Sequence, residues 1–319
     1  MSNRVITPTR TIVMTGATRG IGNVAAIKLL QDAPDVHLAA VARPAAGDVA
    51  GELRQASGNP NVNTVTADLA SLESLRGAAA VLRGQLDRGA LPPLVGFVGN
   101  AGLQLLRATD ATVDGIEATF AVNVLANHVL VDELCAHFTP PARIVITTSD
   151  THFGDFKHNM GMAPAPRWRE PRALSTPGSA DRPDRAAAGR TAYSTSKLAV
   201  IYLVHALARR LPTGVEVFSF NPGFVPGTGL ARDAGAISRF AFGRIMPALS
   251  RTPYGRSVTV SGADLAAAAI GPVAAASGSY INGTAVERSS PESYDVDREE
   301  ALWEELTRLA ADQATAIPR

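Results

Sequence analysis

Cysteine is almost absent from this sequence, which has one, Cys135, among 319 residues. A single cysteine excludes an internal disulfide framework and fits a reducing compartment. It lies in the apolar run "NHVLVDELCAHF", where a small buried side chain is a simpler interpretation than a catalytic thiol. Histidine is also scarce, and His128, His137 and His205 fall in helix-like segments without the arrangement of metal ligands. We therefore expect no metal site.

An excess of either charge is missing as well. The net charge is +1, which gives no reason to expect a nucleic acid or an anionic membrane as partner. No uninterrupted apolar run reaches the roughly 18 residues typical of a membrane span. The first ten residues, "MSNRVITPTR", lack the apolar core of a signal peptide. We expect a cytoplasmic protein without a membrane span, acting on a small molecule.

What the sequence does contain is a regular alternation of short apolar runs with longer segments of helical spacing. Several short runs are apolar at consecutive positions, as in parallel strands covered on both faces. The predicted strands are 11–15, 36–41, 62–66, 94–98, 143–148, 215–220 and, more weakly, 279–283. The predicted helices are 21–31, 71–86, 115–138 and 192–211. This order predicts an α/β fold with a doubly wound parallel sheet of about seven strands and helices on both faces, in one domain over 8–312.

Two segments interrupt the alternation. Residues 150–190 carry five prolines and several arginines without a sustained period, and we name this segment the insert. Long loops of this kind are commonly functional, so we expect the insert near the substrate mouth. His152, His158 and Trp168 are its candidate substrate contacts. The second segment, 223–256, is rich in Gly and Pro and is predicted to be a substrate lid.

A glycine-rich turn follows the first predicted strand. "TIVMTGATRGIG" places Gly16, Gly20 and Gly22 between a strand and a helix. Glycines there allow a tight turn and a close backbone approach, and the free N–H groups of the helix N-terminus can bind a pyrophosphate. With the preceding Thr15, the spacing resembles that of the classical short-chain dehydrogenase/reductase family.

The resemblance implies a Rossmann fold and a nicotinamide dinucleotide. Three further motifs follow in family order: "ADL" with Asp68 at the adenine, "GNAG" lining the cofactor cleft, and "FAVNV" with Asn123. "NPGFVPGT" resembles the turn beside the nicotinamide, although Gly227 stands where the family often has Thr or Ser. The implied cofactor contacts are Thr15, Gly16, Thr18, Arg19, Gly20, Ile21, Gly22, Arg43, Asp68, Leu69, Asn100, Ala101, Gly102, Tyr193, Lys197, Pro222, Gly223, Val225 and Thr228.

Two arginines favour NADP(H) over NAD(H). Proteins that prefer NAD usually place an acidic residue after the second strand to bind the ribose hydroxyls. Here Arg43 stands there, and Arg19 lies inside the glycine turn. Two guanidinium groups near that ribose favour a 2′-phosphate by charge and by bidentate geometry.

The motif "AYSTSK" places Tyr193 and Lys197 four positions apart on one helix face. A free phenol has a pKa near about 10, and a lysine ammonium beside it, with the positive nicotinamide ring, favours the phenolate. We therefore predict a lowered Tyr193 pKa. The resemblance gives Tyr193 the role of acid/base and places Ser149 at the carbonyl oxygen. It gives Lys197 the ribose hydroxyls and Asn123 a water that connects Lys197 to solvent.

The spacing of 44 positions from Ser149 to Tyr193, the motif "SDTH" and the helix-like "REEALWEELTRL" resemble the branch of retinol dehydrogenases and protochlorophyllide reductase. That branch implies a carbonyl/alcohol oxidoreductase for a fairly large, apolar molecule. Two alternatives stay open: a C=C reductase of the protochlorophyllide type, and an NADP(H)-binding sensor or scaffold without catalysis. Relatives often form homodimers or homotetramers through the helices of Asn123 and Tyr193, and the insert could block one of those surfaces.

Overall fold

One mixed β-sheet runs through the middle of the computed structural model, which describes residues 6–159, 161, 163–225 and 256–312. The order of its strands is β3-β2-β1-β4-β5-β6-β7-β8, and all neighbours are parallel except β7 and β8. The strands are β1 Arg10–Thr15, β2 Val36–Ala42, β3 Val62–Thr66, β4 Leu94–Gly99, β5 Phe138–Thr147, β6 Val215–Asn221, β7 Tyr280–Asn282 and β8 Ala285–Glu287. The predicted doubly wound α/β fold is confirmed.

The count of about seven strands falls one short, and the sheet is not wholly parallel. The eighth strand, Ala285–Glu287, is exposed throughout and antiparallel to β7. Three exposed residues carry no apolar pattern, so the sequence gives no signal for this edge strand. The fifth strand begins at Phe138, five residues before the predicted start. The sequence prediction missed its first half because that half includes the exposed Pro140 and Pro141, which are not typical of a strand.

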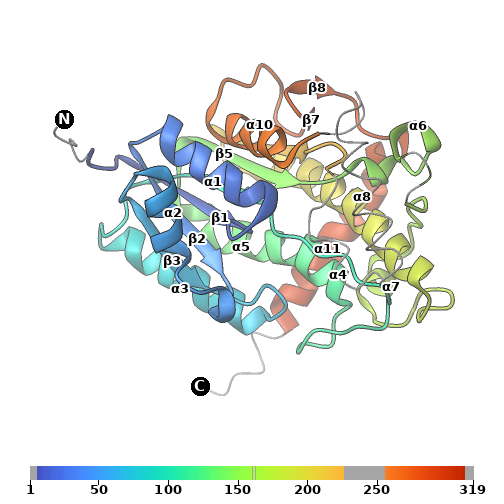
Figure 1. The fold of residues 1–319 in the computed structure, drawn as a ribbon. Helices are drawn as coiled ribbons and strands as arrows, with labels where there is room; N and C mark the ends of the chain where they lie inside the picture. Colours follow the sequence, from blue (N-terminus) through green and yellow to red (C-terminus); the bar gives the residue numbers. More distant parts are fainter. Residues whose placement is uncertain (1–5, 160, 162, 226–255, 313–319) are drawn as a thin grey trace.

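Helices cover both faces of the sheet (Figure 1). On one face lie α1 Gly20–Asp32, α2 Val49–Ser57 and α10 Val258–Ile270. On the other lie α3 Leu72–Asp87, α5 Ala126–Leu134, α8 Ala186–Arg210 and α11 Val296–Asp312. The sequence prediction lacked α2 and α10.

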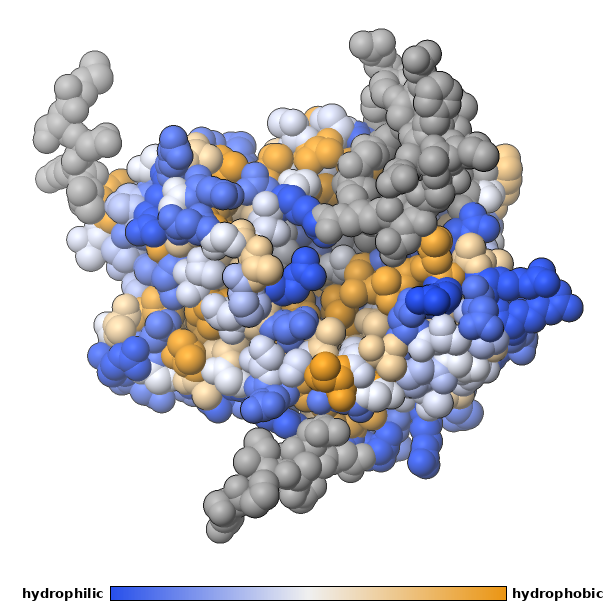
Figure 2. Space-filling model, turned by 60° about the horizontal axis from the view of Figure 1, so that its bottom comes forward, coloured by the Kyte–Doolittle hydropathy of each residue, from blue (hydrophilic) through white to orange (hydrophobic). Residues whose placement is uncertain are grey.

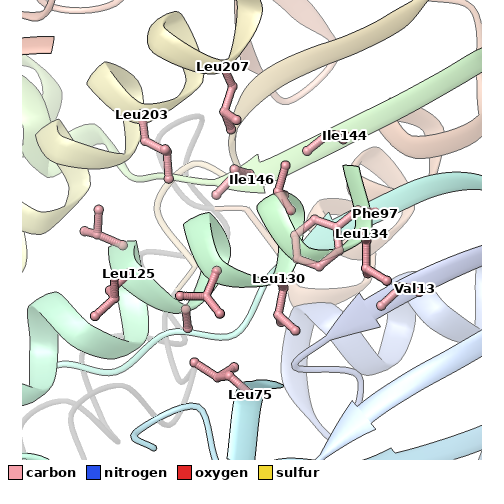
Figure 3. Packing of buried hydrophobic residues seen from close by; sticks show 14 of the residues in the cluster. Val13, Leu75, Phe97, Leu125, Leu130, Leu134, Ile144, Ile146, Leu203 and Leu207 are labelled. Atoms are coloured by element: carbon pink, nitrogen blue, oxygen red, sulfur yellow. The ribbon is translucent and has the colours of Figure 1, made fainter. Parts of the chain in front are cut away.

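The larger apolar core fills the space between the sheet and the second helix layer. Figure 3 shows Val13, Phe97 and Ile144 from the strands among leucines of the helices. All three side chains are fully buried. At about 25 cal/mol per Å² of apolar surface removed from water, burial of this kind is the main term that stabilises the sheet and its helices together.

The helix that carries Asn123 is not regular. It begins as α4 Ala118–Phe120, widens into a π-helical turn, η2 Ala121–Leu125, and continues as α5. A π turn breaks the i→i−4 hydrogen-bond pattern locally, and such turns often lie at functional sites.

The insert contains short helices: η4 Asp150–Phe153, α6 Phe156–Asn159 and α7 Pro171–Ser175. The insert then joins α8, which begins at Ala186, six residues before the predicted start. Trp168 packs edge-on against Tyr202 of α8, with ring centroids 4.7 Å apart. The insert is therefore attached to the outer surface of α8.

The C-terminal helix α11 covers the same surface. Its Leu302 and Leu306 are buried in the larger core, and its Trp303 meets His128 of α5 edge-on at 4.8 Å. Glu299, 2% exposed, accepts a hydrogen bond at 2.8 Å from Nδ1 of His205. The chain itself thus covers the outer faces of α5 and α8.

Most of the predicted lid, residues 226–255, lies outside the described residues. The remaining helices are 3₁₀ turns: η1 Pro44–Ala46, η3 Cys135–His137 and η6 Pro291–Tyr294. Within the part of the chain that the structure describes, no helix combines the length and apolarity of a membrane span.

Candidate active site

The glycine turn joins β1 to α1 as predicted. Gly16 has φ +73°, and a Cβ on it would lie 2.7 Å from the Ala101 nitrogen. A Cβ on Gly22 would lie 2.0 Å from the Gly16 carbonyl oxygen. Only glycine fits at both positions, since L-residues rarely adopt φ near +70° and no side chain tolerates a 2.0 Å contact with the backbone.

The N-terminus of α1 faces outward with its backbone donors available. The N-cap residue, Arg19, is extended, and its side chain does not cap the helix. A Cβ on Gly20 would meet nothing within 4 Å, so open space lies over the turn. Thr18, Arg19 and Gly20 are exposed, and Ile21 is half-buried. Free N–H groups at a helix N-terminus, beside open space, fit a pyrophosphate.

The "GNAG" segment ties this turn to the neighbouring strands. The Asn100 amide donates to the Gly16 carbonyl at 3.2 Å and accepts from the Thr147 hydroxyl at 3.3 Å. The Ala101 N–H donates to the Thr15 hydroxyl at 3.1 Å. Asn100 and Ala101 therefore hold the ends of β1, β4 and β5 in register at the carboxyl edge of the sheet, where doubly wound folds bind their ligands.

The arginines and Asp68 lie along the same edge. Arg43 comes directly after β2, Asp68 comes two residues after β3, and both are exposed. The Asp68 carboxylate accepts from the Ala70 N–H at 3.0 Å, while Leu69 is half-buried. No described residue pairs with the guanidinium group of Arg19 or Arg43, so both remain available to an anion.

Three predicted catalytic side chains come together between β5 and α8. Tyr193 and Lys197 are 7% and 4% exposed, and the Ser149 side chain lies close enough to the Tyr193 hydroxyl to lower its pKa. The Lys197 ammonium donates to the Thr147 carbonyl at 3.0 Å and lies 5.6 Å from the centre of the Tyr193 ring. Ser149 comes two residues after the end of β5, so the strand end and one helix face position all three.

The protein's own groups shift the Tyr193 pKa in the direction opposite to the prediction. Burial raises the pKa of Tyr193 to about 12, and the nearby Ser149 side chain opposes this only in part. Burial also lowers the pKa of Lys197 to about 8, because an ammonium loses hydration there. Desolvation, which residue spacing does not reveal, outweighs the effect of neighbouring charge at these two residues.

Lys197 is a buried cation whose other donors have no acceptor among the described residues. An ammonium has three N–H donors, and here one of them reaches a carbonyl. Buried charges are otherwise paired, so acceptor oxygens of a ligand, such as ribose hydroxyls, fit this position. The side chain therefore supports a nucleotide ribose next to Tyr193.

Asn123 lies in the π turn and faces the same group. Its amide donates to the Leu103 carbonyl at 3.0 Å and to the Ser196 hydroxyl at 2.9 Å, and its oxygen accepts from the Leu103 N–H. A Cβ on Gly102 would lie 3.2 Å from this oxygen and 3.5 Å from the Lys197 nitrogen. The amide thus has partners on all sides and fixes the loop after β4; a water relay through Asn123 stays a prediction.

Sequence reasoning missed the network beneath Ser149. His152 is 1% exposed; its Nδ1 donates to the Ser149 carbonyl at 2.7 Å, and its Nε2 accepts from the Ser290 N–H at 3.1 Å. Asp150 accepts from the Tyr280 hydroxyl at 3.1 Å and from the amide of Asn221. The C-terminal strands and the segment after them therefore support the end of β5.

The three candidate substrate contacts in the insert, His152, His158 and Trp168, each contact other parts of the protein. His152 has a partner on both ring nitrogens, so its role is to hold Ser149. His158 stacks on Phe153 at 3.7 Å and pairs with Asp155. Trp168 lies against α8 on its outer surface.

The turn after β6 contains the remaining predicted contacts. Pro222 accepts a hydrogen bond from the Ser261 hydroxyl at 2.7 Å, Gly223 has φ +74°, and Val225 is buried. Thr228 lies outside the described residues.

Known proteins are similar to this chain over most of its length. A family model described as short chain dehydrogenase matches residues 10–161. Retinol dehydrogenase 13 of Mus musculus is 30% identical, over 95% of this chain and 84% of that protein. The chain belongs to the short-chain dehydrogenase/reductase family.

A fungal member of this oxidoreductase family is about as similar to the chain as the mouse protein is. The short-chain dehydrogenase fogG of Aspergillus ruber is 31% identical, over 93% of this chain and 83% of that protein. Among solved structures, the NADPH-bound carbonyl reductase from chicken fatty liver has a TM-score of 0.57 at 20% identity, covering 86% of this chain and 97% of that one. This last likeness concerns the fold, and the short-chain dehydrogenase/reductase fold extends over most of the chain.

Proposed function

We propose that this protein is an NADP(H)-dependent oxidoreductase that interconverts a carbonyl and an alcohol on a fairly large, apolar small molecule. One observation carries the proposal: the hydroxyl groups of Tyr193 and Ser149 lie next to each other, beside the buried ammonium of Lys197. Two hydroxyl donors at one point can bind a carbonyl oxygen together, and this is the atom that needs a proton on reduction.

NADP(H) supplies or accepts the hydride when it is bound. The chain's own contribution begins at the glycine turn, where the N–H groups of α1 bind the pyrophosphate and Arg19 and Arg43 bind the 2′-phosphate. Asp68 contacts the adenine, and Lys197 donates to the ribose hydroxyls. Two solved structures of similar fold support the assignment by analogy, since the chicken carbonyl reductase and a blue fluorescent protein from a metagenomic library both bind NADPH.

Tyr193 holds the proton that the substrate oxygen receives. With a pKa of about 12 the phenol is neutral at pH 7 and therefore available as a donor. Lys197, with a pKa of about 8, is mostly protonated at neutral pH and can return a proton to Tyr193. Ser149 orients the substrate oxygen, and Asn123 holds the loop that borders Lys197.

Substrate size and oligomeric state are inferred from the surroundings of the site. The similarity to retinol dehydrogenase 13 supports an apolar substrate by analogy. Because α11 and Trp168 of the insert cover the outer faces of α5 and α8, we propose that those faces do not join two copies, in contrast to the expected homodimer or homotetramer.

The test is NADPH oxidation with a panel of apolar ketones and aldehydes. We expect turnover with NADPH, weaker turnover with NADH, and a loss of at least about 10³-fold in the Tyr193→Phe variant, since removal of a general acid typically costs 10² to 10⁴. Binding of NADPH to the variant, followed by fluorescence, should be unchanged. Tight NADPH binding with no turnover of any substrate would favour the sensor or scaffold alternative.

A further inference from the structure

A cavity with a volume of about 440 Å³ opens between the insert and the first half of α8, apart from the catalytic residues described above. Pockets that bind small molecules commonly measure about 300 to 1,000 Å³. Thr191 and Thr195 of α8 line it on one side, and Arg167, Arg169 and Arg182 of the insert line it on the other. In Figure 2 hydrophilic side chains project from the right-hand edge, on the side where Figure 1 places α7.

The cavity is on the opposite side of α8 from the catalytic residues. Successive residues of an α-helix are about 100° apart, so Thr191 and Thr195 point away from Tyr193 and Lys197. Neither Tyr193 nor Ser149 is among the described lining residues. The cavity is therefore a separate site and not an extension of the carbonyl position.

An incompletely paired carboxylate lies in its wall. Glu117 is 4% exposed, and its Oε2 accepts from the Phe120 N–H at 2.7 Å. Its Oε1 is buried and has no hydrogen-bond partner within 3.5 Å among the described residues. Burial raises the pKa of Glu117 to about 7, against the weaker effect of nearby N–H and hydroxyl donors of Phe120 and Thr119. A buried acceptor without a partner is unfavourable, so a ligand donor that reaches this carboxylate would be stabilising. Oε1 is covered by the protein itself, and the Glu117 side chain has to turn towards the cavity to make this contact.

The opposite side of the cavity is positively charged. Arg167 and Arg169 share one carboxylate, Asp181, at 3.4 and 3.3 Å. Arg182 and Arg185 also line the cavity, both are exposed, and no described residue pairs with either guanidinium. One acidic residue, Asp181, therefore faces four arginines on this side, which leaves an excess of positive charge. Guanidinium groups bind carboxylates in a bidentate manner, so this charge favours a carboxylate ligand.

We propose that this cavity binds a small organic carboxylate whose acid group contacts Arg182 and Arg185 and whose hydroxyl or amino group donates to Glu117. Between these two ends the walls are mostly apolar, with Phe120, Leu174 and Ala188 among the lining residues. The body of the ligand is accordingly a hydrocarbon or an aromatic ring. This site does not depend on the proposed reaction.

The site touches the catalytic machinery through one hydroxyl. Ser196 lines the cavity, and its hydroxyl accepts from the Asn123 amide at 2.9 Å and donates to the Tyr193 carbonyl at 2.7 Å. A ligand in the cavity thus lies next to a residue that holds Asn123 and the backbone of Tyr193.

The test is calorimetric titration of the whole protein with 4-hydroxybenzoate and 3-(4-hydroxyphenyl)propanoate. Benzoate lacks the donor for Glu117, and 4-hydroxybenzamide lacks the charge. We expect at least one of the two hydroxy acids to bind, and each matched probe to bind at least about tenfold more weakly. The Arg182→Ala and Arg185→Ala variants should each weaken binding about tenfold or more, and in Glu117→Gln the preference for the hydroxyl should disappear.

Two controls locate the binding. The Arg88→Ala variant removes an exposed arginine at the end of α3, far from the cavity, and the double variant Arg19→Ala, Arg43→Ala removes the proposed phosphate contacts. Both should bind the probes as the unchanged protein does. Equal binding by Arg185→Ala, loss of binding in the Arg19/Arg43 variant, or no heat from either hydroxy acid up to millimolar concentration would overturn the proposal.

Discussion

Replacement of His152 by phenylalanine tests how the end of β5 is held. The ring is buried, and it joins the Ser149 carbonyl to the Ser290 N–H. Phenylalanine has a ring of similar shape, and His152 already lies among the rings of Phe153 and Tyr280. The substitution therefore keeps the packing and removes both hydrogen bonds.

The magnitude follows from one donor left without a partner and one hydrogen bond lost. The Ser290 N–H loses its acceptor, whereas the Ser149 carbonyl still accepts from the His152 backbone N–H at 3.1 Å. An unsatisfied buried donor costs about 1 to 3 kcal/mol and a lost hydrogen bond about 0.5 to 1.5 kcal/mol, so we expect the free energy of unfolding to fall by about 2 to 4 kcal/mol at pH 7.5. In a chain of this size, this corresponds to a decrease in Tm of roughly 4 to 8 °C, at about 2 °C per kcal/mol.

The pH dependence sets the sign of a second effect. Burial lowers the pKa of His152 from 6.5 to about 4, so the unfolded chain binds a proton between these values that the folded chain does not. Its contribution to stability is complete above pH 6.5 and declines as the pH falls towards 4. At pH 5 the unchanged protein should have lost about 2 kcal/mol through this group, at about 1.4 kcal/mol per pH unit, and the variant should have lost nothing through it.

Urea unfolding at pH 7.5 and pH 5 measures both effects. The gap in unfolding free energy between the two proteins should narrow by about 2 kcal/mol at the lower pH. The matched variant His152→Asn retains a side-chain donor for the Ser149 carbonyl and so holds Ser149 better than His152→Phe does. Because Ser149 orients the substrate oxygen, His152→Asn should keep more of the catalytic turnover. A gap that is the same at both pH values would refute the argument that His152 is neutral and buried in the folded protein.

Three further predictions concern the turn, the coenzyme and the assembly. Gly22→Ala places a Cβ 2.0 Å from the Gly16 oxygen, so NADPH affinity should fall and the free energy of unfolding should drop by about 1 to 3 kcal/mol. Gly77→Ala, within the helix α3 and with open space around its Cβ, should leave NADPH affinity unchanged and raise Tm slightly, because alanine is the better helix former; equal losses in both variants would contradict the close approach. Arg19→Ala and Arg43→Ala should each raise the Kd for NADPH about tenfold or more and leave that for NADH unchanged, because a charged hydrogen bond contributes about 1.5 to 3 kcal/mol; equal losses for both coenzymes would refute the phosphate role. Light scattering after gel filtration should give the mass of one chain, 33.2 kDa. If the protein is instead a dimer, and a charged substitution on the outer face of α5 dissociates it, the proposal that the chain itself covers this face is wrong.

The sequence predicted those parts of the site that depend on short spacings. Gly16 and Gly22 must be glycines because of one turn, and Tyr193 and Lys197 share a face because of one helix period. The strand ends then meet at one edge because the sheet is parallel. These features follow from local geometry and from the order of the elements.

Contacts between distant segments could not be predicted in this way. The partner of His152 on its second nitrogen is Ser290, 138 positions away, and the insert is held by α8 and α11 rather than by a pattern of its own. Glu117 gave a weak signal, as an acid within the apolar stretch "GIEATFAVNV". The direction of the Tyr193 pKa also depends on burial, which a one-dimensional spacing does not give.

The position of α11 has a consequence for synthesis on the ribosome. The helix Val296–Asp312 is made after all eight strands and after the helix of Tyr193, yet its Leu302 and Leu306 complete the core beside α8. During translation part of the apolar side of α8 therefore stays uncovered until α11 has left the exit tunnel. The catalytic helix acquires its final packing only at that stage, long after its own residues have been made.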